Sequence, residues 1–131
     1  MDEFNLIKNY FQKLTKDNPA ALKLNDDVFF DKKNKVVLSV DTYNEKVHYV
    51  DFKKPGLLIK KIIRSSISDL ICKGIKPKYI FISGSGNQKH FNKKNLSLIS
   101  KSINEEQKKY DIKLSGGDTT KSKYSSFTIV S

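Results

Sequence analysis

Cysteine, arginine and long apolar runs are all scarce in this chain of 131 residues. Its single cysteine, Cys72, excludes an internal disulfide framework and is typical of proteins that fold in the reducing cytoplasm. No stretch is apolar over the roughly 20 residues that a membrane-spanning helix needs, and the N-terminus lacks the apolar core of an export signal. We therefore expect a cytoplasmic protein without a membrane anchor.

Arg64 is the only arginine, although the chain carries 25 basic against 14 acidic residues and a formal net charge of +11. Such a surplus often indicates nucleic-acid binding. Here lysine supplies almost all of the positive charge, the lysines are scattered along the chain, and arginine is the residue that reads bases and phosphates in bidentate fashion. We interpret the surplus as a solvated cationic surface that attracts polyanions, and we do not expect a nucleic-acid partner.

The apolar residues that are present predict one folded domain of class α+β. Helical spacing predicts three helices, at 4–14, 54–73 and 93–110, with Gly74 ending the second. Runs of β-prone residues predict strands at 28–30, 36–41, 78–83, 112–114 and 124–130. This order of elements predicts a mixed sheet with the helices packed on one of its faces.

Two glycine segments are predicted to interrupt the strands. Ser115 to Thr120 (SGGDTT) is interpreted as a turn, in which the glycines let the backbone approach a phosphate and the acid suits a divalent cation. Gly84 to Asn87 (GSGN) is predicted to end the strand at 78–83 as a flexible turn. It is no Walker loop, because no Gly-Lys-Ser/Thr sequence follows it.

Asp41, at the far end of a predicted buried strand, and Asp69, at the edge of a predicted apolar helix face, occupy positions where an acid that is simply exposed to solvent is not expected. Alternation along 36–41 places Ser39 and Asp41 on one face of the strand and Val40 on the other. Asp26 and Asp27, before the neighbouring strand, would repel Asp41 unless a cation lies between them, although solvated strand ends are the open alternative. Asp69 lies at the border of the apolar face of helix 54–73, about 20° from Ile62 on a helical wheel.

Four acidic motifs follow one another along the chain: Asn25-Asp26-Asp27, Ser39 to Tyr49 (SVDTYNEKVHY), Ser66 to Gly74 (SISDLICKG) and Gly116 to Thr120 (GGDTT). In this order they resemble the thiamine-monophosphate kinase family, whose pattern has Gly-Asp-Asp, Ser-Thr-Asp-Thr-Leu-Val-Glu-Gly-Val-His-Phe, Asn-Leu-Ser-Asp-Leu-Ala-Ala-Met-Gly and Gly-Gly-Asp-Thr-Thr. The opening from Glu3 to Ile7 also fits. The resemblance covers nearly the whole chain.

The resemblance implies a kinase that uses Mg²⁺ and ATP and transfers the γ-phosphoryl group directly onto thiamine monophosphate, giving thiamine diphosphate and ADP. It implies that Gly117 and Asp118 contact ATP, that His48 contacts the substrate, and that no residue acts as a covalent nucleophile. His90 falls outside the motifs and is given no role. The implied Mg²⁺ ligands are carboxylates, one hydroxyl and one backbone group: Asp27, Asp41, Asp69, Asp118, Ser39 and Val40.

The resemblance also implies the N-terminal domain of the fold shared with aminoimidazole-ribonucleotide synthase, in which two sheets complete a barrel in a homodimer. Family members are more than twice as long, so we expect residues 1–131 to be the ATP- and Mg²⁺-binding, dimerising domain and to turn over poorly alone. Four residues depart from the pattern: Asn25, Val40, Lys46 and Ser66. Lys46, in place of glycine, would either crowd the substrate or bind its phosphate.

Three alternatives stay open. The first is another ATP- and Mg²⁺-dependent enzyme of the same superfamily, such as selenophosphate synthetase. The second is a non-catalytic dimerisation domain whose site has decayed. The third is a basic nucleic-acid-binding module, for which salt-sensitive RNA or DNA binding without a response to Mg²⁺-ATP would be diagnostic.

Overall fold

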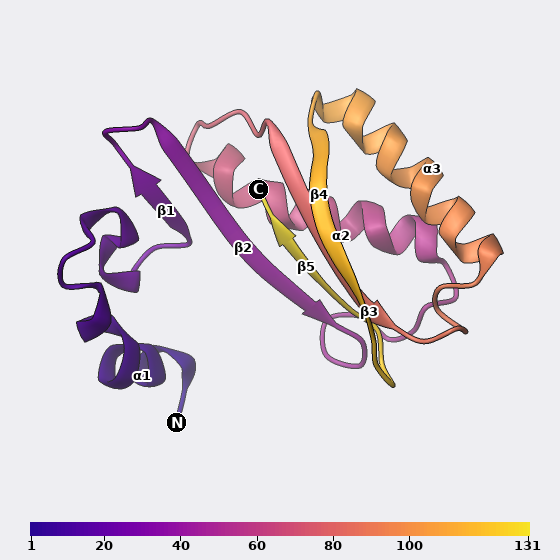
Figure 1. Ribbon diagram of the computed structural model, residues 1–131, viewed down its shortest axis with the longest axis horizontal. Coiled ribbons are helices and arrows are strands. Elements are labelled where there is room, and N and C mark those ends of the chain that lie inside the picture. The colour runs from indigo at the N-terminus through magenta and orange to yellow at the C-terminus, as the bar shows by residue number, and fades with distance from the viewer.

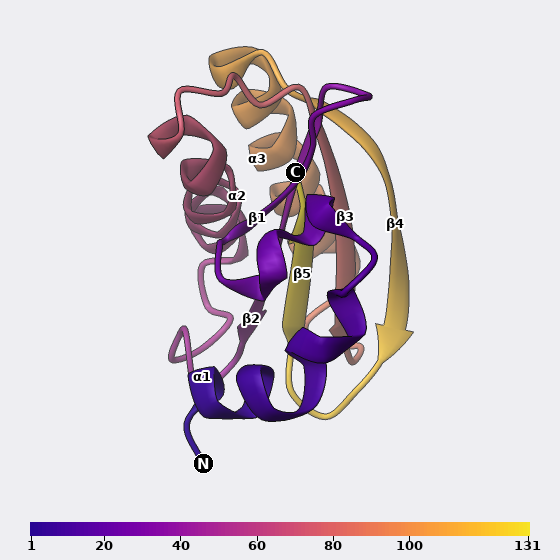
Figure 2. The same ribbon diagram turned by 90° about the vertical axis from the view of Figure 1, so that its left-hand side faces the viewer.

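Two long helices cover one face of a five-stranded mixed sheet in the computed structural model, which describes residues 1–131 (Figure 1). The strands lie in the order β1-β2-β5-β3-β4; β3 and β4 are parallel and all other neighbours are antiparallel. The elements are β1 (Val28–Asp31), β2 (Val36–Asn44), α2 (Pro55–Cys72), β3 (Tyr79–Gly86), α3 (Lys93–Tyr110), β4 (Lys113–Lys121) and β5 (Ser126–Val130). The predicted α+β class, with helices on one sheet face, is confirmed (Figure 2).

Helix α2 forms because Pro55 suits the first helical turn and isoleucines recur at helical spacing behind it. Ile59, Ile63 and Ile67 are at most 1% exposed and pack with Ile80 of β3 and Ile129 of β5. The helix ends before Gly74, which has a left-handed φ of 74°. No helix of the structure is both long and apolar enough to cross a membrane.

Helix α3 is tied to α2 by the one arginine of the chain. Asn92 caps α3 by accepting a hydrogen bond from the Asn95 backbone N–H at 2.9 Å. On the inner side, Arg64 Nε and Nη2 donate to the two carboxylate oxygens of Glu106 at 2.8 and 2.7 Å. Glu106 is only 1% exposed, so the bidentate guanidinium compensates a buried charge.

The predicted turn at the Gly-Gly-Asp segment is wrong, because β4 runs straight through it. Strands β3 and β4 shift register between Ile80 and Phe81, and beyond that point Gly117 pairs with Ile82. A β-carbon on Gly117 would lie 1.8 Å from the Ile82 carbonyl oxygen, so glycine is needed there for close approach of two strands.

The predicted strand end at 84–87 is also wrong, because β3 continues to Gly86. At Gly84 and Gly86, aromatic rings fill the space that a larger residue's side chain would need. A β-carbon on Gly84 would lie 3.3 Å from the ring of Phe127, and one on Gly86 would lie 2.9 Å from the ring of Phe91. These glycines therefore make room for packing within a strand.

The N-terminal segment is helical as predicted, but it is not one regular α-helix. It consists of the α-helical turn α1 (Glu3–Leu6), a π-helical turn at Ile7–Phe11 and 3₁₀ turns at Gln12–Thr15 and Pro19–Leu24. Its apolar side chains are unburied; Phe4 is 85% exposed. A helix gains most of its stability from packing of its apolar face, which this segment does not achieve within the chain.

The sheet face opposite the helices is open and carries apolar side chains. Strand β2 alternates as predicted, because Ser39 is 1% exposed on the helix side whereas Val40 is 63% exposed on the open side. Val40 pairs with Val130 of β5, which pairs with Phe81 of β3. We call this surface the open face; its exposed apolar residues on β2 and β3 are Val36, Leu38, Val40, Tyr79 and Phe81.

Candidate functional site

Three of the four predicted carboxylates lie near one another: Asp41 and Asp69 between β2 and α2, and Asp27 just before β1, close enough for its charge to act on Asp41. Together with Ser39 we call them the acidic cluster. Alternation in β2 turns Ser39 and Asp41 toward α2, whose apolar stripe places Asp69 beside them. Ser39 Oγ donates a hydrogen bond to Asp69 Oδ2 at 3.2 Å across 30 residues of sequence. Asp27 immediately precedes β1, and its neighbour Val28 pairs with Ser39.

Repulsion within the acidic cluster is visible in the pKa values. Burial, followed by the negative charges of Asp69 and Asp27, raises the pKa of Asp41. Burial, followed by the charges of Asp41 and Asp69, raises the pKa of Tyr43 to about 12. One lysine faces these acids: Lys73 Nζ lies 2.7 Å from Asp26 Oδ1, and its pKa is raised first by Asp26 and further by the charges of Asp27 and Asp69. The cluster therefore holds more negative charge than the chain itself compensates.

The donor chemistry of the acidic cluster suits Mg²⁺, which prefers carboxylate and other oxygen ligands. The Ser66 hydroxyl is buried beside Asp41 and acts to lower the pKa of that carboxylate, yet it makes no hydrogen bond of good geometry. A bound cation would give the buried hydroxyl a partner for its oxygen and would remove the repulsion on the Asp41 carboxylate. No three His, Cys, Asp or Glu side chains form a ready-made cage in this structure, so a metal would have to draw the carboxylates together.

Asp118 lies away from the acidic cluster. It pairs with Ser83 on β3, in the same row as Thr128 and Thr42, and its Oδ1 accepts a hydrogen bond from the Thr119 backbone N–H at 2.8 Å. This row alternates with buried Ile129 and so belongs to the open face. Strands β5 and β3 separate β2 from β4, and three strand spacings amount to roughly 14 Å. One copy of the chain does not bring Asp118 to Asp41.

His48 closes the turn after β2. Its Nδ1 accepts a hydrogen bond from the Asn44 backbone N–H at 2.8 Å, and its ring meets the edge of Tyr43 with 5.8 Å between the ring centroids. In the same turn, Lys46 has a left-handed φ of 71°. Glycine would adopt this conformation without strain, whereas a lysine side chain adopts it at a cost.

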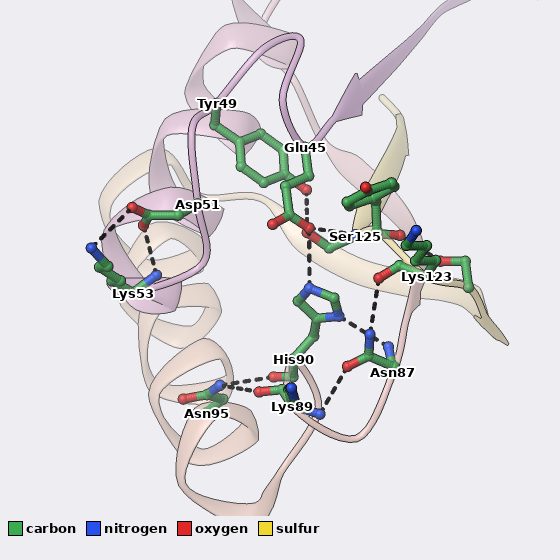
Figure 3. Close-up of polar contacts among 12 residues, drawn as sticks. Glu45, Tyr49, Asp51, Lys53, Asn87, Lys89, His90, Asn95, Lys123 and Ser125 are labelled. Carbon is green, nitrogen blue, oxygen red and sulfur yellow. Dashed lines mark hydrogen bonds and ion pairs between the residues drawn. The ribbon is translucent and has the colours of Figure 1, made fainter.

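A buried polar network that the sequence does not reveal centres on His90 and Glu45 (Figure 3). His90 Nδ1 accepts a hydrogen bond from the Asn87 backbone N–H at 3.0 Å, so Nε2 carries the proton and donates to Glu45 Oε2 at 3.1 Å. Ser125 donates to the same oxygen from its N–H at 2.8 Å and its hydroxyl at 3.1 Å. These partners are 45 and 80 residues apart in sequence, which leaves no local signal to detect.

Beside this network lies a pocket of about 1050 Å³, which we call the cationic pocket. It is at the carboxyl ends of β2, β3 and β4, three strands that run in one direction. It includes Thr119 and Thr120 of the Gly-Gly-Asp-Thr-Thr motif but no member of the acidic cluster. The side chains that give it its charge and its aromatic character are Lys46, Lys89, Lys121, Lys123, Phe91 and Tyr124.

Comparison with known proteins places the chain in one group. The model of the family "AIR synthase related protein, N-terminal domain" matches residues 16–131. Thiamine-monophosphate kinase of Haemophilus influenzae is 31% identical over 125 residues, which are 92% of this chain and 38% of that protein. The chain thus spans about 38% of the length of this curated relative.

Solved structures share the fold. Thiamine monophosphate kinase from Aquifex aeolicus superposes with a TM-score of 0.81 at 22% identity, over 98% of this chain and 41% of that one. AaThiL complexed with AMPPCP and TMP gives a TM-score of 0.84 at 23% identity, over 98% of this chain and 40% of that one. At these identities the likeness establishes the fold.

Proposed function

Because the chain belongs to the family of AIR synthase related proteins, N-terminal domain, we propose that it supplies the Mg²⁺- and ATP-binding half of a thiamine-monophosphate kinase. The reaction moves the γ-phosphoryl group of ATP onto the phosphate of thiamine monophosphate. The curated relatives at 30–31% identity carry this name, and AaThiL has been solved with AMPPCP and TMP. The observation that carries the proposal is the acidic cluster, assembled from three separate segments.

Each residue of the site has a distinct task in this proposal. Asp27, Asp41 and Asp69 hold Mg²⁺, with Ser39 and the Val40 backbone completing the shell. When bound, the metal neutralises phosphate oxygens and aligns them for transfer. Asp118 adds a further carboxylate and Gly117 admits the ATP phosphates close to the backbone of β4, while His48 contacts the substrate. The acceptor oxygen is already ionised, so no side chain need act as a nucleophile.

The distance between Asp118 and the other carboxylates leads to a proposal about assembly. Strand β1 pairs only with residues 36–39 of β2, which leaves the outer edge of residues 40–44 without a partner, and the outer edge of β4 has none either. We propose that β4 of one copy lies along this free part of β2 in a second copy, twice over, so that two sheets close into a barrel. The open faces would then form its interior.

This arrangement would bring the β4 backbone at Asp118 of one copy within about one strand spacing of the β2 edge at Val40 and Asp41 of the other. Asp118 starts on the open face and Asp41 faces α2, so the Asp118 carboxylate would have to turn across that strand edge to reach a metal held by Asp41. Each metal site would thus be completed by a second polypeptide. The exposed apolar side chains of the open face, Val40 and Phe81 among them, support the proposal, because the barrel would remove them from water.

Calorimetric titration of AMPPCP into the wild-type chain tests the metal-binding role. We expect binding with Mg²⁺ that weakens about tenfold or more when a chelator replaces the metal, and a comparable loss in Asp41→Asn and Asp118→Asn. Asp111→Asn is the matched control, since it removes the same charge at an exposed position and asparagine tolerates the left-handed φ of 52° there. Equal binding with and without Mg²⁺, unchanged in both site variants, would contradict the proposal.

A further inference from the structure

We infer that the cationic pocket is a second anion site, which binds a phosphate-bearing small molecule without a metal ion. Four lysines from three segments line it: Lys46 after β2, Lys89 before α3, and the neighbouring pair Lys121 and Lys123 at the end of β4 and in the turn to β5. None of the four makes an ion pair within the chain, because the lysines that do are Lys53, Lys60, Lys73 and Lys76. No carboxylate of the chain therefore neutralises these four charges, and Lys123 Nζ lies 5.3 Å from the centroid of the Tyr124 ring.

The one acid that lines the pocket, Glu45, is already occupied. Its Oε2 accepts three hydrogen bonds, from His90 Nε2 and from the N–H and hydroxyl of Ser125, and its side chain is 10% exposed. Tyr49 Oη extends the network to Ser125 Oγ at 2.7 Å. Glu45 therefore holds together the residues that line the pocket and does not neutralise the lysines.

The backbone that carries each lysine is fixed by hydrogen bonds, as Figure 3 shows for two of them. Asn87 Nδ2 donates to the Lys123 carbonyl at 2.9 Å, and Asn95 Nδ2 donates to the Lys89 carbonyl at 3.1 Å. The Lys46 N–H donates to Tyr49 O at 2.7 Å, and Lys121 pairs with Gly86 in the sheet. A site whose walls are already held loses little entropy when a ligand binds.

The size and lining of the pocket indicate the class of ligand. A volume of about 1050 Å³ accommodates a nucleotide-sized molecule. Phe91 and Tyr124 are the aromatic residues that line the pocket, with Lys123 Nζ 5.3 Å from the centroid of the Tyr124 ring, and Thr119 and Thr120 line it as hydroxyl-bearing residues. An aromatic compound that carries a phosphate or pyrophosphate group satisfies all three features. One of the four lysines, Lys46, holds its place in the lining with a left-handed φ of 71°, at some cost in backbone strain.

The first test uses tripolyphosphate in the presence of a chelator, with the wild-type chain and the double variant Lys121→Gln/Lys123→Gln. We expect wild-type binding that needs no metal and a loss of about tenfold or more in the double variant. The charge-matched control is Lys8→Gln/Lys13→Gln in the N-terminal segment, which should bind within about twofold of wild type. An equal loss in the control, or no binding in chelator, would overturn the inference.

Two further arms distinguish the source of the phosphate. AMPPCP and thiamine monophosphate are titrated separately in chelator, and either one binding more tightly than tripolyphosphate, with the same dependence on Lys121 and Lys123, identifies the ligand. A single-stranded oligonucleotide that binds more tightly than all three, with a steep salt dependence, would overturn the small-molecule site. The test separates this site from the proposed kinase function. Asp41→Asn is expected to abolish Mg²⁺-dependent AMPPCP binding at the acidic cluster and to leave tripolyphosphate binding at the cationic pocket in chelator unchanged.

Discussion

Asp41 occupies a position that the metal-free chain disfavours. It is partly buried between β2 and α2, and both its burial and the charges of Asp69 and Asp27 raise its pKa. Neither the strand nor the helix needs a carboxylate there for folding, since a neutral side chain of the same shape would relieve the repulsion. A residue that opposes stability in this way is typical of a functional site.

The first prediction concerns this conflict between stability and function. Asp41→Asn should raise the Tm of the metal-free protein by roughly 2–4 °C, because it removes a repelled charge whose effect is partly screened by solvent. The same variant should lose the stabilisation that Mg²⁺ gives to wild type. Thermal melts with Mg²⁺ and with chelator measure both effects, with Asp111→Asn as the control. A lower Tm for Asp41→Asn in chelator would contradict the account of the cluster.

Gly117 gives a second prediction at the scale of one residue. A β-carbon there would lie 1.8 Å from the backbone oxygen of Ile82, which cannot move without breaking the β3–β4 pairing. We expect Gly117→Ala to lower the free energy of unfolding by about 2 kcal/mol or more. At Gly116 the nearest atom is 3.1 Å away on the Phe81 ring, which can rotate, so Gly116→Ala should cost about 1 kcal/mol or less. Denaturant melts that rank the two variants in reverse would show that β4 does not approach β3 in this way.

At the scale of elements, the Glu45–His90 network joins the end of β2, the loop before α3 and the start of β5. Burial alone would raise the pKa of Glu45, but the hydrogen bonds from Ser125 and the contact with His90 outweigh it and hold the pKa below its ordinary value of 4.5. A lowered carboxylate pKa contributes stability that is present above the unfolded pKa and is lost as the pH falls through the folded one.

Acid melts test this linkage. We expect wild type to lose stability as the pH falls from about 4.5 through the lower folded pKa of Glu45. Glu45→Gln should be less stable than wild type at pH 7, and the difference between the two should shrink over that pH window, since only wild type has this carboxylate to protonate. The other acids with lowered pKa values titrate in both proteins and cancel in the comparison. A difference that stays constant down to pH 3 would contradict the assigned role of Glu45.

The elements also show which parts of the fold the sequence can predict. Helices α2 and α3 begin and end within about a residue of their predicted bounds, because caps, glycines and apolar spacing are local signals. The faces of β2 were predictable from alternation for the same reason. Strands β3 and β4 were predicted too short, because a glycine in a strand resembles a turn until the partner strand that needs its close approach is known.

The candidate site likewise has parts that local sequence signals predict and parts that only the tertiary structure reveals. The motifs predicted the residues of the acidic cluster, but only the sheet order reveals that Asp118 lies on another strand and another face. His90 gave no signal at all, because its partner Glu45 is 45 residues away and meets it only through tertiary packing. Arg64 likewise proved to be a structural residue, paired with buried Glu106.

At the scale of the whole molecule, several surfaces and strand edges that have no partner within one chain support one proposed assembly. The sheet has an apolar open face, an edge at β4 without a partner, half of β2 without an outer neighbour, and a fourth acid far from the other three. Each would be satisfied if two copies closed a barrel with β4 of one beside β2 of the other. The assembly and the metal site then become a single proposal, since neither is complete without the second copy.

Mixing two inactive variants tests that proposal most directly. Asp41→Asn and Asp118→Asn are each expected to lose Mg²⁺-dependent AMPPCP binding when alone. After the two are unfolded together and refolded as a mixture, about half of the dimers contain one chain of each kind, and one of their two sites combines an intact Asp41 with an intact Asp118 from the other chain. Calorimetry should then recover about a quarter of the wild-type binding capacity. If the mixture binds no more than its separate components, each site lies within one chain or the dimer does not form, and the account is wrong.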